Sequence, residues 1–395
     1  MRDLSNNGAG INILKSLVGL GVLNLPFATK QVGCLTSVLG MGLMAAMTVY
    51  GAFFAVASKA KLDARHLSGV CPTEATPLKP CGPSSNYGLG CFDTVVREVL
   101  GWPGLALWVS SVVCYQGGIG VAYITLISQS MQNMTGMSHI HSLGFLCAVL
   151  TMMSSVRRMA GVALLSLAGL LVYLFVFLAL ARESAHRLAD GKLGATASMW
   201  STAGSEGLGS WFGIVSFAYC GLPICLSVYE DMKRPQDSMK VISFSFAVAW
   251  AIFAAFGGLG YLCYGQDTAE VIYMNFPEGS ITRRWSEVAL GVILMLTYVL
   301  QMMPVWNCVE ACMGDSLHWL AQRAATVALT VLIAMLVPNT LLLVSVTGAV
   351  AAAISGFVLP PLVYLNLDPR PSPIEYIASS MLLVLGILGA AKGIA

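Results

Sequence analysis

The stretch NILKSLVGLGVLNLP, residues 12–26, opens the first apolar segment of the chain and makes a poor continuous helix. Gly19, Gly21 and Pro26 fall within eight positions of one another. Glycine adds backbone entropy that folding must remove, and proline lacks an amide donor. The stretch AYCGLP, residues 218–223, combines Gly221 and Pro223 in the same way. Each stretch therefore predicts a helix that is interrupted part of the way along.

The composition around these stretches indicates that lipid is the main solvent. Of the 395 residues, only 10% are charged and 57% are hydrophobic, and the mean hydropathy is +0.77. Soluble domains carry about 25% charged residues, so a cytosolic globular enzyme, a disordered chain and a secreted disulfide scaffold are excluded. The 21 basic and 19 acidic residues leave a net charge of +2. Nucleic-acid binding is not expected, since it requires a strongly basic face.

Membrane-spanning helices need about 20 mostly apolar residues. Eleven segments are predicted to span, at residues 11–29, 35–57, 105–131, 143–155, 161–181, 211–229, 241–264, 288–309, 324–337, 341–365 and 374–391. Two connections are long, at 59–104 and 182–210, and the others are too short to fold alone. We therefore expect a short N-terminal segment, residues 1–10, followed by one polytopic domain, residues 11–395.

Basic residues are retained on the cytoplasmic side of a membrane. If the N-terminus is in the cytosol, the cytoplasmic side carries roughly twice as many Lys and Arg residues as the opposite side. A cytosolic N-terminus is therefore predicted. The connection at 59–104 is then cytosolic and reducing, and its three cysteines, Cys71, Cys81 and Cys91, are not expected to form disulfides. Their ten-residue intervals are not a zinc spacing.

The two interruptions lie five spans apart, which is typical of inverted repeats. We expect repeat one at about 11–181, repeat two at about 211–365 and an extra helix at about 374–391. Unwound backbone at membrane depth is tolerated where it lines a cavity. Free amides near Val22 would attract an anion, and carbonyls near Ala218 and Tyr219 could accept from an ammonium. An amino acid zwitterion matches both ends, although glycine and proline can also simply kink packed helices.

The sequence resembles the amino acid/auxin permease family, in particular its vacuolar and proton-coupled amino acid transporter branches. The resemblance begins with residues 12–33, NILKSLVGLGVLNLPFATKQVG, and continues through FAYCG at 217–221 and YEDMKRP at 229–235. GGLGYLCYG at 257–265, LVPN at 336–339, Gly348 and LPP at 359–361 follow in order. The ordered set covers nearly the whole chain.

The resemblance implies an all-α membrane protein of about 11 helices, a LeuT-like transporter with broken helices one and six. It places the substrate site at the two breaks, at Ser16, Gly19, Leu20, Gly21, Val22, Phe217, Tyr219, Cys220 and Gly221. Further lining is expected at Gln116, Tyr123, Thr297 and Gln301. The implied function is secondary active transport of amino acids by alternating access, and no catalytic residue, metal site or cofactor is expected.

No Asp or Glu lies near the centre of a predicted span, so a basic substrate side chain would find no carboxylate. Ionisable groups inside a membrane are costly and are otherwise the usual functional candidates. We therefore expect small or medium neutral amino acids as substrates. Lys15 and Glu230 lie toward the cytosolic ends of the two broken helices. They are predicted either to pair across an inner gate or to extend separately to the interface.

The resemblance to the proton-coupled branch of the family implies that H⁺ is the coupling ion. Na⁺ is the alternative, because Thr297 and the helix-one carbonyls could hold sodium. A transporter-fold amino acid sensor that signals through a partner is a further alternative. A membrane enzyme is disfavoured, because HExxH, GxSxG and carboxylate-cluster motifs are absent. Expected partners are the amino acid and the lipid bilayer of a vacuolar, lysosomal or plasma membrane, and no oligomeric state is predicted.

Overall fold

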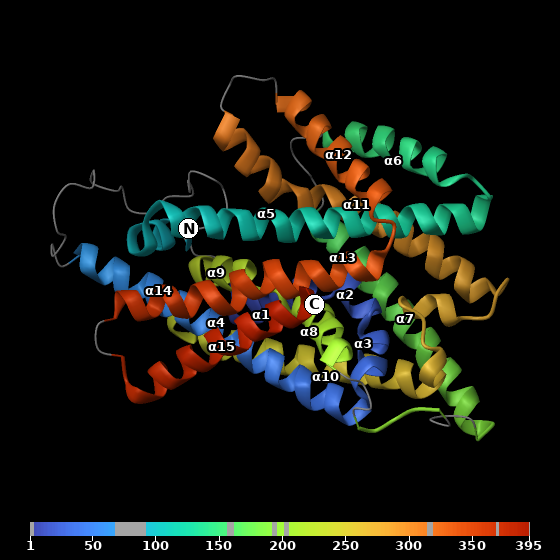
Figure 1. Cartoon of the computed structure of the whole chain (residues 1–395), viewed down its shortest axis with the longest axis horizontal. Coiled ribbons are helices and arrows are strands. Elements are labelled where there is room, and N and C mark those ends of the chain that lie inside the picture. Colours follow the sequence, from blue (N-terminus) through green and yellow to red (C-terminus); the bar gives the residue numbers. More distant parts are fainter. Residues whose placement is uncertain are drawn as a thin grey trace.

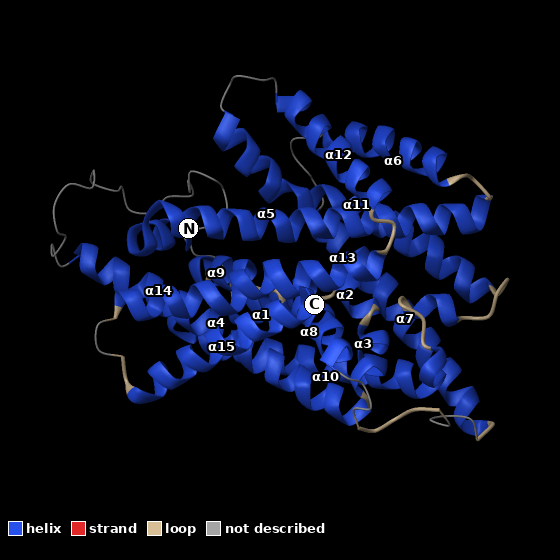
Figure 2. Ribbon diagram, viewed as in Figure 1, coloured by secondary structure: helices blue, strands red, loops and turns tan. Residues whose placement is uncertain are grey.

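The computed structural model describes residues 4–67, 92–155, 162–191, 196–200, 205–313, 319–368 and 371–394. Within these ranges the protein consists of helices and connecting loops (Figure 2), with one isolated β-bridge between Leu4 and Met232. Cys71, Cys81 and Cys91 lie outside the described residues, so their predicted reduced state stays a prediction.

The helices follow one another along the chain in an order that Figure 1 shows by colour. The first seven are α1 (Asn6–Leu17), α2 (Leu20–Leu23), α3 (Leu25–Val32), α4 (Cys34–Leu67), α5 (Phe92–Thr135), α6 (His139–Ser154) and α7 (Val162–Ala189). The middle of the chain forms α8 (Ser205–Tyr219), α9 (Leu222–Asp231), η1 (Pro235–Asp237), α10 (Ser238–Tyr264), η2 (Gly265–Asp267) and η3 (Ile272–Asn275). The rest forms α11 (Ile281–Met313), α12 (Trp319–Leu336), α13 (Thr340–Thr347), η5 (Gly348–Ala352), η6 (Ile354–Val358), α14 (Leu359–Leu367) and α15 (Pro373–Ile394).

The described helices match the predicted spans. Within the described residues, nine segments are long and apolar enough to cross a membrane, and α6 is a shorter apolar helix. The first predicted span corresponds to the interrupted series α1–α3. Each of the eleven predicted segments therefore has a helical counterpart, and the chain is an all-α, multi-pass membrane protein.

The helices run further than the apolar segments do. α4 continues to Leu67 and α5 begins at Phe92, so both enter the connection expected at 59–104. α5 bends at Gly101, whose φ of 68° lies in the left-handed region. Glycine adopts a positive φ at little cost in conformational free energy, because it has no Cβ atom. Hydropathy misses the first turns of α5 because only the part beyond the bend is apolar enough to contact lipid.

The two interrupted helices lie inside the bundle. α1 packs against α9 and α10, and α8 packs against α3, α13, η5 and α15. Figure 1 shows α1, α2 and α8 in the middle, with α6 and α12 together at one side. η5, which packs against α8, and η6, which follows it, are π-helical, and π-helical turns are frequent at functional sites.

The two ends of the bundle differ in what forms them. At the N-terminal end, the Leu4 amide donates to the Asp231 carbonyl over 3.0 Å, so the start of the chain lies beside the end of α9. At the opposite end, which we call the far end, Lys30 at the end of α3 contacts the segment that follows α10. The end of α5 contacts the same segment, through Ser130 and Tyr273. The central site lies between these two ends.

Candidate functional site

Both predicted interruptions are present. α1 ends at Leu17 and α2 begins at Leu20, and the intervening Gly19 is extended, with φ −152° and ψ −161°. α8 ends at Tyr219 and α9 begins at Leu222. The two prolines of the motifs stand in the first turns of α3 and α9, where the missing amide would be unpaired in any case. The sequence therefore ends and restarts each helix in the middle of the bundle.

A cavity of about 270 Å³ lies at these interruptions. Four of the predicted site residues line it from the two breaks: Ser16, Gly19, Cys220 and Gly221. Four more line it from α5 and α11: Gln116, Tyr123, Thr297 and Gln301. The structure thus brings together residues that are up to 285 positions apart in the sequence numbering, from Ser16 to Gln301.

The described residues that line the cavity supply one charge and several oxygens with unused acceptor capacity. Lys15 is the only formally charged residue among the described residues that line it. The Gln116 Oε1 atom is buried and finds no donor in the described part of the chain. The Ser16 and Thr297 hydroxyls donate to the Ile13 and Ile293 carbonyls over 2.8 and 2.7 Å, respectively. Each hydroxyl oxygen can still accept a hydrogen bond from a ligand.

Two tyrosines that the sequence analysis missed also line the cavity, Tyr115 and Tyr173. The Tyr115 hydroxyl donates to the Phe217 carbonyl over 3.0 Å, and the rings of these two residues lie 5.6 Å apart. Tyr115 therefore satisfies a carbonyl beside the break in helix six. A mid-span tyrosine carries no spacing signal of its own, and only its neighbour Gln116 was predicted.

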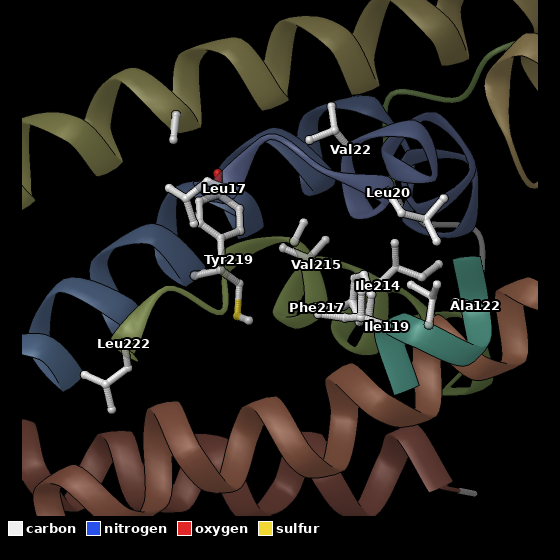
Figure 3. Close-up of a cluster of buried hydrophobic side chains, with 14 of the residues drawn as sticks. Leu17, Leu20, Val22, Ile119, Ala122, Ile214, Val215, Phe217, Tyr219 and Leu222 are labelled. Carbon is white, nitrogen blue, oxygen red and sulfur yellow. The ribbon is translucent and has the colours of Figure 1, made fainter. Parts of the chain in front are cut away.

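The other five predicted residues, Leu20, Gly21, Val22, Phe217 and Tyr219, are buried but do not line the cavity. Figure 3 shows Leu20 and Phe217 close to Ile119, Ala122 and Ile214, with Val22 pointing away from them on the other side of helix one. We call this packed group the apolar barrier, defined by Leu20, Gly21, Val22, Ile119, Ala122, Ile214 and Phe217. Direct contact of its members with substrate stays a prediction.

Lys15 and Glu230 do not form an ion pair. Lys15 lines the cavity, whereas Glu230 stands in the last turn of α9, and none of the ion pairs recorded among the described residues joins the two. Gate pairing of these residues therefore stays a prediction. Among the described residues no group of three His, Cys, Asp or Glu side chains could hold a metal ion.

Comparison with known proteins gives a whole-length match. The family model described as "Transmembrane amino acid transporter protein" covers residues 2–395. Amino acid transporter AVT3A of Arabidopsis thaliana is 25% identical over 401 residues, covering 97% of this chain and 86% of the relative. Vacuolar amino acid transporter 4 of Saccharomyces cerevisiae is 24% identical, covering 75% of this chain and 39% of its own length. These relatives are named as transporters, not enzymes.

Solved structures share the fold. A manganese transporter of Eremococcus coleocola superposes with a TM-score of 0.56 at 10% identity, over 99% of this chain and 87% of that chain. MhsT in complex with L-phenylalanine superposes with a TM-score of 0.51 at 12% identity, over 97% of this chain and 98% of that chain. At such identities the likeness shows the LeuT-like fold alone.

Proposed function

Because the chain belongs to the transmembrane amino acid transporter family, we propose that it is a secondary active transporter of small or medium neutral amino acids. Transport proceeds by alternating access, with the cavity at the two helix interruptions as the substrate site. The observation that carries this proposal is the enclosure of polar groups from both breaks around one cavity. Unwound backbone and buried polar atoms are costly in a membrane unless they serve a ligand or are buried in protein.

The charges of the cavity suit a zwitterion with a neutral side chain. The Lys15 ammonium can receive the α-carboxylate, and the orphaned Gln116 Oε1 can receive the α-ammonium. A charge-assisted hydrogen bond is stronger than a neutral one. A lysine or arginine side chain would meet the like charge of Lys15, and none of the described lining residues is acidic. Neutral amino acids are therefore favoured over basic ones.

The apolar barrier accounts for one half of an alternating-access cycle. We propose that its members close the route from the cavity toward the far end, because Leu20 and Ile214 are almost completely buried. To release substrate in that direction, helix one must move away from α8 and α5. Such discrete rearrangement of packed elements is how transporters of this kind expose one site to either side.

We propose that a proton gradient drives transport. Sodium coupling is the alternative, and the test must distinguish proton-driven from sodium-driven uptake. Thr297 and the carbonyls of the helix-one break are neutral oxygens of the kind that sodium prefers. We also propose that Lys15 and Glu230, which do not pair with each other in this structure, pair when the gate at the N-terminal end closes and separate when it opens. We also propose that the protein lies in a vacuolar membrane, because the yeast relative is named a vacuolar amino acid transporter. The proposed cytosolic position of the N-terminus rests on the distribution of Lys and Arg along the sequence.

The test is uptake of radiolabelled alanine and leucine into proteoliposomes of the purified protein. A proton gradient and a sodium gradient are imposed separately, with protonophore-treated and protein-free vesicles as controls. Concentrative uptake driven by protons is expected, with arginine a poor competitor. Uptake driven only by sodium would replace the proton proposal, and binding without any flux would favour the sensor.

A further inference from the structure

A second hollow, of about 520 Å³, lies at the far end of the bundle. It is lined by Phe27 of α3, by Gln129 and Gln132 at the end of α5, and by Thr268 and Glu270 in the segment after η2. It shares no lining residue with the central cavity. The hollow is therefore a separate place where a solute could be held.

Glu270 is the only formally charged residue among the described residues that line this hollow. Burial raises the pKa of the Glu270 carboxyl, and no basic side chain in the described part of the chain offsets that rise. A partly desolvated carboxylate without a cationic partner gains more from an arriving cation than a solvated one does. The side chain is therefore suited to a ligand that carries an ammonium group.

A cation stands at the rim of the same hollow. The Lys30 ammonium donates to the Thr268 carbonyl over 3.3 Å and lies 5.3 Å from the centre of the Phe27 ring. Thr268 and Glu270 are two residues apart on one segment, yet Lys30 does not pair with Glu270. The Glu270 carboxylate lines the hollow, and the Lys30 ammonium beside it contacts two other lining residues without pairing with Glu270, so the two charges together suit a zwitterion.

The wall of the hollow is joined to helix one. The Asn24 Nδ2 atom donates to the Glu270 backbone carbonyl over 2.8 Å. Asn24 is completely buried between α2 and α3, and its Oδ1 atom finds no donor among the described residues. Glu270 is therefore attached to the segment that must move when the apolar barrier opens.

We propose that this hollow is a second amino acid-binding site, in which the ammonium group binds Glu270 and the carboxylate binds Lys30. It is a peripheral site through which substrate enters or leaves on the far side. The proposal rests on the proposed transport function. Because the hollow lies at the far end of the bundle, we expect its contribution to be restricted to one face of the membrane.

The experiment compares wild type with Glu270→Gln in proteoliposomes captured through an N-terminal tag, so that all vesicles expose the same face. Initial rates of labelled alanine flux are measured from each face in turn. The substitution removes a half-buried charge, so the apparent KM from the far side should rise by about 3- to 10-fold. The apparent KM from the N-terminal side should stay within about 2-fold, because the central cavity is unchanged.

Glu278→Gln is the matched control, because its side chain is 93% exposed, lies in the loop before α11 and loses the same charge. Equal KM shifts in both variants, or an unchanged far-side KM in Glu270→Gln, would overturn the second site while leaving transport intact. If Glu270→Gln does not fold, Lys30→Gln replaces it, with the same one-sided rise expected and the same outcomes decisive. Absence of alanine flux in wild type would instead reject the proposed function.

Discussion

Gly21 of α2 lies directly against Ala218 of α8, so the two interrupted helices meet backbone to backbone inside the apolar barrier. A Cβ atom at position 21 would fall 2.9 Å from the Ala218 Cα atom and 3.0 Å from the Phe217 ring. Real Cβ contacts with a backbone atom are not this short, so any larger residue must push the helices apart. The absence of a side chain at Gly21 is what allows the barrier to close.

Gly21→Ala is therefore expected to prevent full closure of the barrier. Overpacking of this kind costs about 1–3 kcal/mol, which corresponds to a roughly 5- to 140-fold lower population of the closed state. Alanine exchange in proteoliposomes should fall by a similar factor. Gly117→Ala on α5 is the control, because a Cβ there has nothing within 4 Å, and it should exchange at the wild-type rate.

Lys15→Gln should weaken recognition of the substrate carboxylate. In wild type, alanine should compete for uptake about 10- to 100-fold better than alaninamide, which lacks the carboxylate charge. In Lys15→Gln that preference should shrink toward parity, and inhibition by arginine should strengthen. Lys240→Gln, at an 85% exposed side chain at the start of α10, removes the same charge and should keep the wild-type preference. A preserved preference in Lys15→Gln would remove Lys15 from the site.

Tyr115→Phe retains the aromatic ring beside Phe217 but removes its hydrogen bond to the Phe217 carbonyl. Leaving a buried acceptor unpaired costs about 1–3 kcal/mol. We expect a lower melting temperature in detergent and a reduced stabilisation by added leucine. Tyr50→Phe, at a half-exposed tyrosine on α4, should change neither quantity. Equal melting behaviour of the two variants would show that Tyr115 does not support the break in helix six.

Glu270 should make stability depend on pH. Because its folded-state pKa is raised, the folded protein binds this proton more tightly than the unfolded chain does. The resulting destabilisation is absent in acid, grows as pH rises through the unfolded pKa of about 4.3 and is complete above the folded value. Glu270→Gln should therefore melt slightly higher than wild type at pH 7 and equally at pH 3.5. A lower melting temperature at pH 7 would contradict this sign.

The sequence predicted those features that depend on local chemistry. Gly19 and Gly221 stand at the two interruptions, and Pro26 and Pro223 stand in the first turns of α3 and α9, so the approximate positions of both interruptions follow from residue types. The eleven apolar segments follow from hydropathy in the same way. The resemblance to a known family then directed attention to Gln116 and Thr297, which line the cavity with the two breaks.

The remainder depends on contacts between distant segments. Leu20 and Phe217 are buried in the barrier and do not line the cavity, because α2 packs against α8 there, and spacing along one helix does not show this. Tyr173 faces the cavity from α7, within a span that has no interruption to mark it. The hollow at Glu270 depends on how the segment after α10 folds back over α3, which leaves no periodic pattern in the sequence.

The central claim is that an amino acid binds between the two helix interruptions. A structure of the protein determined with saturating leucine tests it most directly. We expect density for one leucine in the central cavity, with its carboxylate near the Lys15 ammonium and its amino group within hydrogen-bond reach of Gln116. Density confined to the far-end hollow, or an empty central cavity at a leucine concentration that saturates uptake, would contradict the account.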